Sequence, residues 1–455
     1  MKILLISPAF DAMEPHFQLG LLYLAAQTRD RHDVKVLDLT IQKMTRGELL
    51  SYIRAEGFHV VGITAMTFQI NPAHDIAGKI KQSNPHIKVI MGGMHSTALF
   101  SEVLKDRNID FVVVGEGEST FLELLERLEA GGDTFSDIKG IAYRDNGSVH
   151  FTGLREFVDI NKLKFPARDL VPISETLPEN TIFGQPAMDI LLSRGCPGAC
   201  IFCASCNVWK KKLRLRSIES MVEEITHLKD TYRVRYFKIM DDLFINNKES
   251  ALRFCEAVTP LKIRFTCGMR INIVDEEILK AMKRAGAVNV LYGVETGSKE
   301  IMKKIKKGAS IEKIREVFAL HKKVGSPATA SVIVGHPYET EDDLKQTVQL
   351  IRDLDPFFVS VQYMTPYPGT ELFQIAPETG ETSTFNWDEY YLISKPIYIP
   401  NDLDEATMIR YYQIIASLNA GRLHLMKKLF QVALRMKTDI FNRKLKTYIK
   451  ARLQR

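Results

Sequence analysis

The chain has 455 residues, with 61 Lys and Arg against 55 Asp and Glu, and a formal net charge of +6. The basic excess is concentrated in one segment, because positions 406 to 455 hold twelve basic residues and a single acidic one, Asp439. That segment therefore carries +11, and the 405 residues before it carry −5. With 45% hydrophobic and 25% charged residues, the composition excludes disordered, fibrous and collagen-like chains. At roughly 100 to 200 residues per domain, the length predicts about two to four domains.

The chain contains no uncharged apolar run of the roughly 18 to 20 residues that a membrane-spanning helix needs, which argues against an integral membrane protein. The N-terminal segment Lys2 to Pro8 has neither the long apolar core nor the small-residue cleavage site of a secretory signal. Its apolar run predicts a first buried strand instead. We therefore expect a cytoplasmic protein.

The first 135 residues alternate short apolar runs with amphipathic stretches. Strands are predicted at Lys2 to Ser7, Val34 to Leu39, Val60 to Thr64, Ile87 to Gly92 and Phe111 to Val114. Continuous apolar strands separated by helices are typical of a parallel sheet covered on both faces. The pattern predicts a doubly wound, Rossmann-like α/β domain over residues 1–135.

Residues 136–187 interrupt this rhythm with a predicted hairpin at Asn146-Gly147 and four prolines, which indicates a structured connector. A second strand–helix series follows, with strands predicted at Met188 to Ser193, Tyr236 to Met240, Ile263 to Gly268, Asn289 to Val294, Ala328 to Val334 and Phe357 to Tyr363. Six such repeats predict a partial (β/α)6 barrel of the TIM type over residues 188–395, whose working face lies at the C-terminal ends of its strands. Residues 396–455 are predicted to form a basic helical C-terminal region.

Four of the six cysteines fall within eleven positions, at Cys196, Cys200, Cys203 and Cys206. A disulfide framework would spread cysteines across the fold, whereas this clustering predicts metal or redox chemistry. Thiolates are soft ligands that suit zinc or an iron–sulfur cluster. Structural zinc usually takes four ligands, commonly as two separated CxxC pairs, and no second pair occurs downstream.

The segment Cys196-Pro-Gly-Ala-Cys200-Ile-Phe-Cys203 follows the first predicted barrel strand and has CxxxCxxC spacing. It resembles the cluster motif of the radical SAM superfamily. The resemblance implies that these three cysteines hold a [4Fe-4S] cluster and leave one iron open to S-adenosylmethionine (SAM). A buried or zinc-binding group of thiols is the alternative. Cys206 could approach the cluster, bind another group or quench a radical, and we expect an uninvolved thiol.

Further matches to the superfamily lie at the ends of later barrel strands, in Met240-Asp241-Asp242, Gly293 to Ser298 and Val332 to Gly335. By this resemblance, the SAM-binding residues are expected to be Phe202, Asp241, Asp242, Arg270, Glu295, Ser298 and Val332. Acidic residues at strand ends also cap the helices that follow them, so these acids have a structural alternative. Arg270 could bind a carboxylate or pair with a neighbouring acid.

In a doubly wound domain, ligands bind outside the C-terminal ends of the strands. The loops there contain hydroxyl groups, glycine pairs and acids. The candidate ligand-binding residues are Ser7, Thr64, Thr67, Gly92, Gly93, His95, Gly115, Glu116, Gly117 and Glu118. Glycines let the backbone approach a planar ligand closely, and hydroxyl groups can hydrogen-bond a nucleotide tail. The lack of a GxGxxG fingerprint counts against a nicotinamide cofactor.

The GGxH segment at Gly92 to His95 and the GEGE segment at Gly115 to Glu118 resemble the cobalamin-binding domain that precedes the barrel in one class of radical SAM enzymes. The DxHxxG signature of a lower axial histidine is absent, because His16 has Glu14 rather than an Asp two positions before it. The resemblance therefore implies base-off cobalamin without a histidine ligand. A flavodoxin-like scaffold whose glycines only form turns is the alternative.

The two resemblances together imply a cobalamin-dependent radical SAM enzyme. The expected reaction is C-methylation of an unactivated carbon through a 5′-deoxyadenosyl radical and methylcobalamin, with electrons from an external one-electron reductant. Cyclisation, rearrangement or oxidation without methyl transfer is the first alternative, and a non-catalytic cobalamin and iron–sulfur sensor is the second. The three N-terminal cysteines of the methylthiotransferases are absent, which excludes their mechanism.

Apolar and basic residues interleave between Leu423 and Ile449. A basic amphipathic helix of this kind can lie on an anionic membrane surface, or pack on the barrel with a solvated basic face. We therefore expect a small-molecule or lipid-like substrate, and peripheral membrane contact through this segment is one interpretation of its charge. Nucleic acid is not expected, because no recognised binding module accompanies the charge. Tyr363 and Tyr367 are candidates for either a substrate pocket or aromatic core packing.

Overall fold

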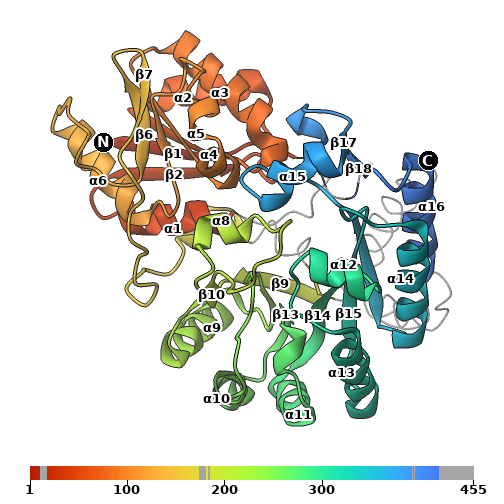
Figure 1. Cartoon of the computed structure of the whole chain (residues 1–455). Helices are drawn as coiled ribbons and strands as arrows, with labels where there is room; N and C mark the ends of the chain where they lie inside the picture. The colour runs from red at the N-terminus through yellow and green to blue at the C-terminus, as the bar shows by residue number, and fades with distance from the viewer. Residues whose placement is uncertain (11–17, 174–180, 183–184, 392, 394, 420–455) are drawn as a thin grey trace.

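A computed structural model describes residues 1–10, 18–173, 181–182, 185–391, 393 and 395–419. The chain forms an N-terminal lobe and a larger barrel lobe (Figure 1). The predicted α/β class with two strand–helix series is confirmed. No helix in the described part of the chain is long and apolar enough to cross a membrane.

The N-terminal lobe is built on one seven-stranded sheet in the order β2-β1-β3-β4-β5-β6-β7. Its five parallel strands are β1 (Lys2–Ser7), β2 (Asp33–Asp38), β3 (Val60–Thr64), β4 (Lys88–Gly92) and β5 (Phe111–Val113). The helices are α1 (Leu19–Thr28), α2 (Arg46–Glu56), α3 (Ile70–Ser83), α4 (Met94–Ala98), α5 (Phe100–Val103) and α6 (Glu118–Glu129). Alternate side chains of β1 enter two cores, one with α1 and α6 and the other with α2 and α3. The sheet is therefore covered on both faces, as its continuous apolar strands predict.

The predicted hairpin forms β6 (Ile141–Asp145) and β7 (Ser148–Phe151), which are antiparallel. Asn146 and Gly147 both have positive φ, 48° and 82°, as a two-residue type I′ turn requires. The strand β6 pairs with β5, so these residues of the expected connector extend the N-terminal sheet. The connector then continues to a short 3-10 helix, η2 (Arg168–Leu170).

The barrel lobe contains six parallel strands in an open sheet. They are β9 (Gln185–Ile190), β12 (Tyr236–Ile239), β13 (Arg264–Gly268), β14 (Ala287–Glu295), β15 (Ala328–Val334) and β16 (Phe358–Tyr363). A short strand, β8 (Thr181–Ile182), pairs antiparallel with β9 at one edge. The outer helices are α9 (Ile218–Tyr232), α10 (Lys248–Val258), α11 (Glu276–Ala285), α13 (Ile311–Val324) and α14 (Glu341–Leu354) (Figure 1). The predicted series of six strand–helix repeats is present.

Several short elements and one longer helix, which packs beside β16 and α14, complete the lobe. They are β10 (Ser193–Arg194), α8 (Ser205–Trp209), β11 (Arg214–Leu215), α12 (Lys299–Lys304), α15 (Glu371–Thr379), β17 (Gly380–Thr382), η5 (Trp387–Glu389), β18 (Tyr398–Pro400) and α16 (Glu405–Ser417). Helix α16 packs on the barrel, where Tyr412 stacks on Tyr363 at a centroid distance of 4.4 Å. Tyr363 therefore belongs to the core, and Tyr367 donates a hydrogen bond to the Tyr390 carbonyl at 3.0 Å. The basic segment after Asn419 lies outside the described residues.

The segment that follows α15 also packs on the N-terminal lobe. Its Tyr391 ring contacts Phe10 and Phe68 at centroid distances of 4.9 and 5.4 Å, and its Trp387 contacts His95 at 5.1 Å. These contacts form an aromatic seam between the lobes. They join the chain beyond the last barrel strand to loops of the N-terminal sheet.

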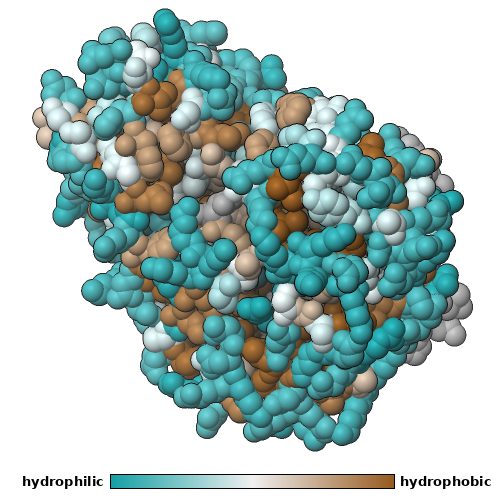
Figure 2. All heavy atoms as spheres, viewed as in Figure 1, coloured by the Kyte–Doolittle hydropathy of each residue, from teal (hydrophilic) through white to brown (hydrophobic). Residues whose placement is uncertain are grey.

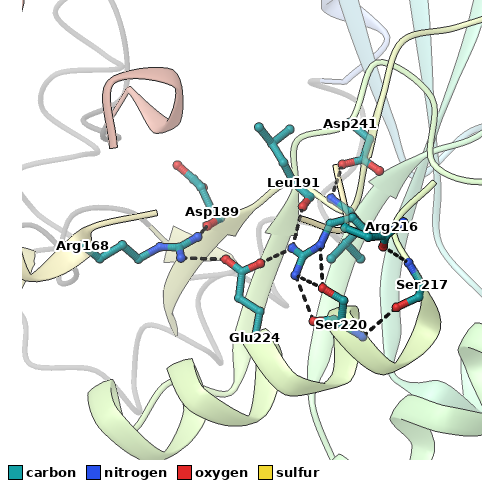
Figure 3. Close-up of polar contacts among 10 residues, drawn as sticks. Arg168, Asp189, Leu191, Arg216, Ser217, Ser220, Glu224 and Asp241 are labelled. Carbon is teal, nitrogen blue, oxygen red and sulfur yellow. Dashed lines mark hydrogen bonds and ion pairs between the residues drawn. The ribbon is translucent and has the colours of Figure 1, made fainter. Parts of the chain in front are cut away.

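A buried charge network supports the end of β9 (Figure 3). Glu224 of α9 is fully buried and accepts hydrogen bonds from Arg168, at 2.7 Å, and from Arg216. These arginines also donate to the carbonyl oxygens of Asp189, at 2.9 Å, and Leu191, at 3.2 Å. One carboxylate thus ties the connector and the outer helix to the strand that leads into the cysteine segment.

Replacing Glu224 with Gln is expected to destabilise the protein strongly. The substitution leaves two buried guanidinium groups without their counter-charge, which costs about 3 to 5 kcal/mol. Chemical denaturation measures the change. Glu223→Gln, at an exposed position of the same helix, is the matched control and should change the unfolding free energy by less than about 0.5 kcal/mol. Equal losses in the two variants would contradict this role of Glu224.

Candidate functional site

A cavity lies between the two lobes. It has a volume of about 420 Å³ and is lined from the N-terminal lobe by the ends of β3, β4 and β5 and by α1, and from the barrel by residues after β9 and β12. A second cavity of about 790 Å³ adjoins it and shares Met94, Thr97, Gly115, Glu116 and Val208. The lobes meet at a waist, with apolar side chains exposed on the N-terminal lobe beside it (Figure 2). A ligand in these cavities would contact both lobes.

Glycines form much of the N-terminal wall. Gly93 has φ +95°, and a Cβ there would lie 2.7 Å from the Ala65 carbonyl oxygen and 2.8 Å from Thr64 Oγ1. Gly115 also has a positive φ, of +88°. No other residue adopts these conformations readily, so the backbone itself can approach a ligand. The predicted residues that line the cavity are Thr64, Gly92, Gly93, Gly115, Glu116, Gly117 and Glu118.

Three residues predicted for this wall, Ser7, Thr67 and His95, line neither cavity. His95 is buried, with Nδ1 3.3 Å from Thr67 Oγ1 and its ring against Trp387. Desolvation lowers the pKa of His95 to about 4, so the ring is neutral. His95 and its neighbour Thr67 therefore pack at the aromatic seam. Ser7 is also buried, and its Oγ has no hydrogen-bond partner among the described residues.

The two acids of the GEGE segment are already paired. Glu116 Oε1 accepts hydrogen bonds from Arg194 Nη1 and Arg214 Nη2, each at 2.8 Å. Glu118 Oε1 accepts one from Arg194 Nη2 at 2.5 Å. Although both acids line the cavity, their charges are neutralised by arginines of the barrel lobe. Sequence patterns gave no sign of this pairing.

The three motif cysteines lie on the loop between β10 and α8. The loop is anchored at Ile201, whose N donates to the Ile305 carbonyl at 3.2 Å and whose carbonyl accepts from Leu372 N at 2.9 Å. A Cβ on Gly198 would lie 3.3 Å from Cys196 Sγ and 4.0 Å from Cys200 Sγ, so these two thiols turn toward the same side of the loop. All three thiols are partly exposed, and burial raises the pKa of Cys200 to about 11.

This donor set fits an iron–sulfur cluster. No three His, Cys, Asp or Glu side chains in the described part of the chain converge on a single metal ion. An iron–sulfur cluster does not need ligands that converge on one ion, because separate irons bind separate thiolates. Three soft thiols on one anchored, partly exposed loop meet that demand. The thiol chemistry of the loop and its position beside the cavity therefore both suit a bound cluster.

Cys206 lies on α8, and its Sγ donates to the Gly198 carbonyl at 3.3 Å. It also hydrogen-bonds Cys203, and this bond is the main reason that the pKa of Cys203 is raised. The fourth thiol is therefore a direct neighbour of the motif. Cys255 and Cys267 are buried in the barrel core, far from any such group in sequence.

The two acids after β12 point in different directions. Asp241 is buried and accepts hydrogen bonds from Leu192 N at 2.8 Å and Ser193 Oγ at 2.6 Å, so it holds the chain that leaves β9. Desolvation raises the pKa of Asp241 to about 7. Asp242 lines the cavity, and desolvation raises its pKa as well. Of the pair, Asp242 is the one placed to meet a ligand.

Glu295 ends β14 with an uncommon positive φ of 63° and forms an ion pair with Lys307. Burial by itself would lower the pKa of Lys307, but the charges of Glu295 and Cys200 outweigh it and raise the pKa. A cation therefore lies beside the cysteine loop. The lysine-rich segment from 303 to 307 gave no signal that its last member would be half-buried here. Ser298 caps α12, where its Oγ accepts from Ile301 N at 3.3 Å.

The remaining predicted SAM contacts differ in their surroundings. Phe202 packs with Ile333 in a small apolar cluster and contacts His336 at a centroid distance of 6.3 Å. Val332 is fully buried on the other face of β15, in the core shared with the outer helices. Ile333 is therefore the residue of this strand that shares a face with Phe202. Arg270 forms no ion pair among the described residues. Burial raises the pKa of the Cys196 thiol, and the positive charge of Arg270 nearby offsets part of that rise.

A buried acid follows β15 that sequence patterns did not single out. Glu339 Oε2 accepts hydrogen bonds from Gly335 N at 2.7 Å and His336 N at 3.1 Å. Desolvation raises the pKa of Glu339 to about 8. The acid therefore shapes the turn that carries His336, next to Phe202 and the carbonyl of Glu295, which is 3.3 Å from His336 Nε2.

Two family models match the chain. The B12 binding domain matches residues 9–125, and the radical SAM superfamily matches residues 190–351. An uncharacterized methyltransferase of Pyrococcus horikoshii is 33% identical over 405 residues, which cover 86% of this chain and 87% of that protein. The anaerobic magnesium-protoporphyrin IX monomethyl ester cyclase of Rubrivivax gelatinosus is 27% identical over 389 residues, or 83% of this chain and 68% of that protein.

A solved structure has the same fold. The radical SAM methyltransferase TsrM from Kitasatospora setae, with cobalamin and a [4Fe-4S] cluster bound, superposes with a TM-score of 0.71. The match covers 92% of this chain and 88% of TsrM at 18% sequence identity. Both lobes and their order along the chain are therefore shared. The chain belongs to the cobalamin-dependent radical SAM enzymes with an N-terminal B12-binding domain, whose cofactors are a [4Fe-4S] cluster, SAM and cobalamin.

Proposed function

We propose that the protein is a C-methyltransferase that acts on an unactivated carbon of a small molecule. The observation that carries this proposal is the cavity between the lobes, because the glycine wall of one lobe and Asp242 of the other face the same space. When bound, the cofactors supply a carbon-centred radical from SAM and a transferable methyl group on cobalamin. The protein then has to place them on opposite sides of the substrate and exclude water.

Each wall of the cavity suits one cofactor. We assign the backbone at Gly93 and Gly115 to cobalamin, since a side chain at Gly115 would enter the open space that a broad planar ring needs, and Gly93 has no room for one against Ala65 and Thr64. The slot between β3, α1 and α6 continues the cavity into the apolar core and suits a nucleotide tail. The residues that would hold the cluster are Cys196, Cys200 and Cys203.

The polar groups around the cysteine loop suit SAM. Arg270 would bind the methionyl carboxylate, because it has no acid partner among the described residues. Asp242 would accept the methionyl ammonium. The apolar pair Phe202 and Ile333 would hold the adenine. The ion pair of Glu295 with Lys307 would fix the loop edge beside them.

Cyclisation is the second candidate reaction, and the similarity to the Rubrivivax gelatinosus cyclase favours it. The Pyrococcus horikoshii relative, which is named a methyltransferase, is more similar and is matched over more of its length. Methylation is therefore the function that the comparisons support better. An external one-electron reductant would be needed in either case.

Isotope labelling distinguishes the two reactions. The anaerobically reconstituted full-length protein is incubated with extracts, reductant and SAM carrying a deuterated methyl group, and products are read by mass spectrometry. Methylation predicts a product that retains label from SAM. A product formed with 5′-deoxyadenosine but without label would contradict methyl transfer and favour the cyclase alternative. A protein that cleaves no SAM would contradict both.

Gly20→Phe is expected to weaken cobalamin binding at least tenfold, or by about 1.4 kcal/mol. Gly20 lines the cavity at the second position of α1, and a Cβ there meets nothing within 4 Å, so the ring enters open space rather than the core. Equilibrium dialysis with hydroxocobalamin measures the dissociation constant.

The matched control is Gly47→Phe. Gly47 is also the second residue of its helix, α2, and also has nothing within 4 Å of an added Cβ, but it lies away from the cavity. Its affinity for hydroxocobalamin should equal that of the wild type. If both variants bind like the wild type, the assignment of this cavity to cobalamin is wrong.

We also propose that the basic C-terminal segment brings the enzyme to an anionic membrane surface. Residues 420–455 carry eleven basic residues and one acid. Ending the chain after Asn419 keeps the hydrogen bond from Val359 N to Asn419 Oδ1, at 2.8 Å, and therefore the packing of α16. The shortened protein should no longer float with phosphatidylserine liposomes, whereas the full chain should float and be released by high salt. Equal flotation of both would refute the idea.

A further inference from the structure

A ribbon of two short strands closes the base of the cysteine loop. Strands β10 and β11 are antiparallel, and Arg194 and Arg214 are direct cross-strand partners. Two like charges in this position repel each other. Glu116 lies between them and accepts from both, which converts the repulsion into a bridged pair. The ribbon is therefore closed by an acid that belongs to the other lobe.

The pairing is buried on both sides. The side chain of Glu116 is 4% exposed, that of Glu118 is 6% exposed, and that of Arg194 is 10% exposed. Charge-assisted hydrogen bonds of this kind are short and strong, and breaking one leaves a buried charge without a partner. The two acids therefore contribute more than a surface ion pair would.

Aromatic rings fix the arginines from the remaining directions. Arg194 lies over Tyr23 of α1 at 5.0 Å and over Trp209 of α8 at 6.0 Å. Arg214 lies over Phe157 of the connector at 4.4 Å. Since a guanidinium stacked between rings has little freedom, the ribbon cannot shift without losing contacts to both lobes.

The position of this arrangement in the chain gives it a functional meaning. Arg194 is two residues before Cys196. Glu116 lies in the loop after β5 that also provides Gly115 and Gly117 to the cavity wall, and Glu118 is the first residue of α6. The same charges thus touch the loop assigned to the cluster and the wall assigned to cobalamin. Transfer between groups held by different lobes depends on their relative position, and an error of about 1 Å can cost about 100-fold in rate.

We propose that Glu116, Glu118, Arg194 and Arg214 form an interlobe clamp, in which Arg194 is a positioning residue that sets the cysteine loop relative to the cobalamin cavity. The inference rests on the proposed function, because it assigns the two cofactors to the two lobes. In this view the GEGE acids act through the arginines and not as ligands. The clamp differs from the aromatic seam, whose contacts join Tyr391 to Phe10 and Phe68, and Trp387 to His95.

The first test needs no cofactor. Hydrogen exchange of the full-length apoprotein is compared for wild type, Arg194→Gln and Arg127→Gln. Arg127 also makes two hydrogen bonds to an acid, both to Asp137 and at a more exposed place within the N-terminal lobe alone, so it is the control for losing an arginine pair that does not join the lobes. The clamp predicts faster exchange in Arg194→Gln at residues 115–118 and 196–215, with β13, β14 and β15 unchanged. Uniform acceleration, or none, would overturn the clamp.

The second test separates reactions that need one lobe from those that need both. In the reconstituted holoenzyme, reductive cleavage of SAM to 5′-deoxyadenosine needs only the barrel, whereas transfer of a labelled methyl group from SAM to bound cobalamin needs both lobes. For Arg194→Gln we expect methyl transfer to slow at least about tenfold while cleavage stays within about threefold. Arg194→Lys, which keeps the charge but loses the fork, should be intermediate. A parallel loss of both reactions would overturn the positioning role.

Glu118→Gln tests the clamp without changing an arginine, so its result does not depend on whether the arginine variants fold. It keeps the shape of the acid and leaves Glu116 to hold the ribbon, so the same selective loss should appear in weaker form. If wild type itself transfers no methyl group to bound cobalamin, the proposed function fails. If wild type transfers it and both variants do so at the wild-type rate, the clamp fails alone.

Discussion

A charge buried in a protein is tolerated only when an opposite charge meets it, and this constraint fixes the chain that leads into the cysteine loop. Glu224 holds two arginines whose other bonds go to carbonyls of β9. Asp241 then holds Leu192 and Ser193, and Glu116 holds Arg194. Every step from the strand to the first cysteine is therefore anchored. The loop that carries the thiols therefore starts from a firmly anchored segment, as a site of precise geometry requires.

The same constraint joins the two lobes. Parallel sheets place their ligand sites at the C-terminal ends of their strands, so two such sheets can share a ligand only if those ends face each other. Here the interlobe clamp at Arg194 and the aromatic seam at Trp387 lie at separate places along the interface. Two contacts of different chemistry resist both sliding and rotation, which keeps the glycine wall opposite Asp242 across the cavity.

Much of the architecture could be predicted from local patterns. The apolar runs gave β1, β3 and β15 with the bounds that the structure shows, and Asn146-Gly147 gave the hairpin. Side-chain roles were harder to predict. His95 and Thr67 have residue types that suit a ligand, yet the His95 ring packs against Trp387, nearly 300 positions later, and Thr67 Oγ1 lies 3.3 Å from His95 Nδ1. Lys307 gave no signal at all, since an exposed and a buried lysine look alike in a basic run.

The sequence by itself determined the α/β class, the order of the lobes, the spacing of the thiols and the places where only glycine serves, because each depends on residues close together in the chain. Only the tertiary structure decided which polar groups face the cavity. Glu116 and Arg194 are 78 positions apart, and no local pattern marks them as partners. Asp241 and Asp242 are adjacent, yet Asp241 holds Leu192 and Ser193, which follow β9, whereas Asp242 hydrogen-bonds Ser205 and Trp209 and lines the cavity. Pairing and burial are properties of the space around a side chain, and that space forms only when the two lobes come together.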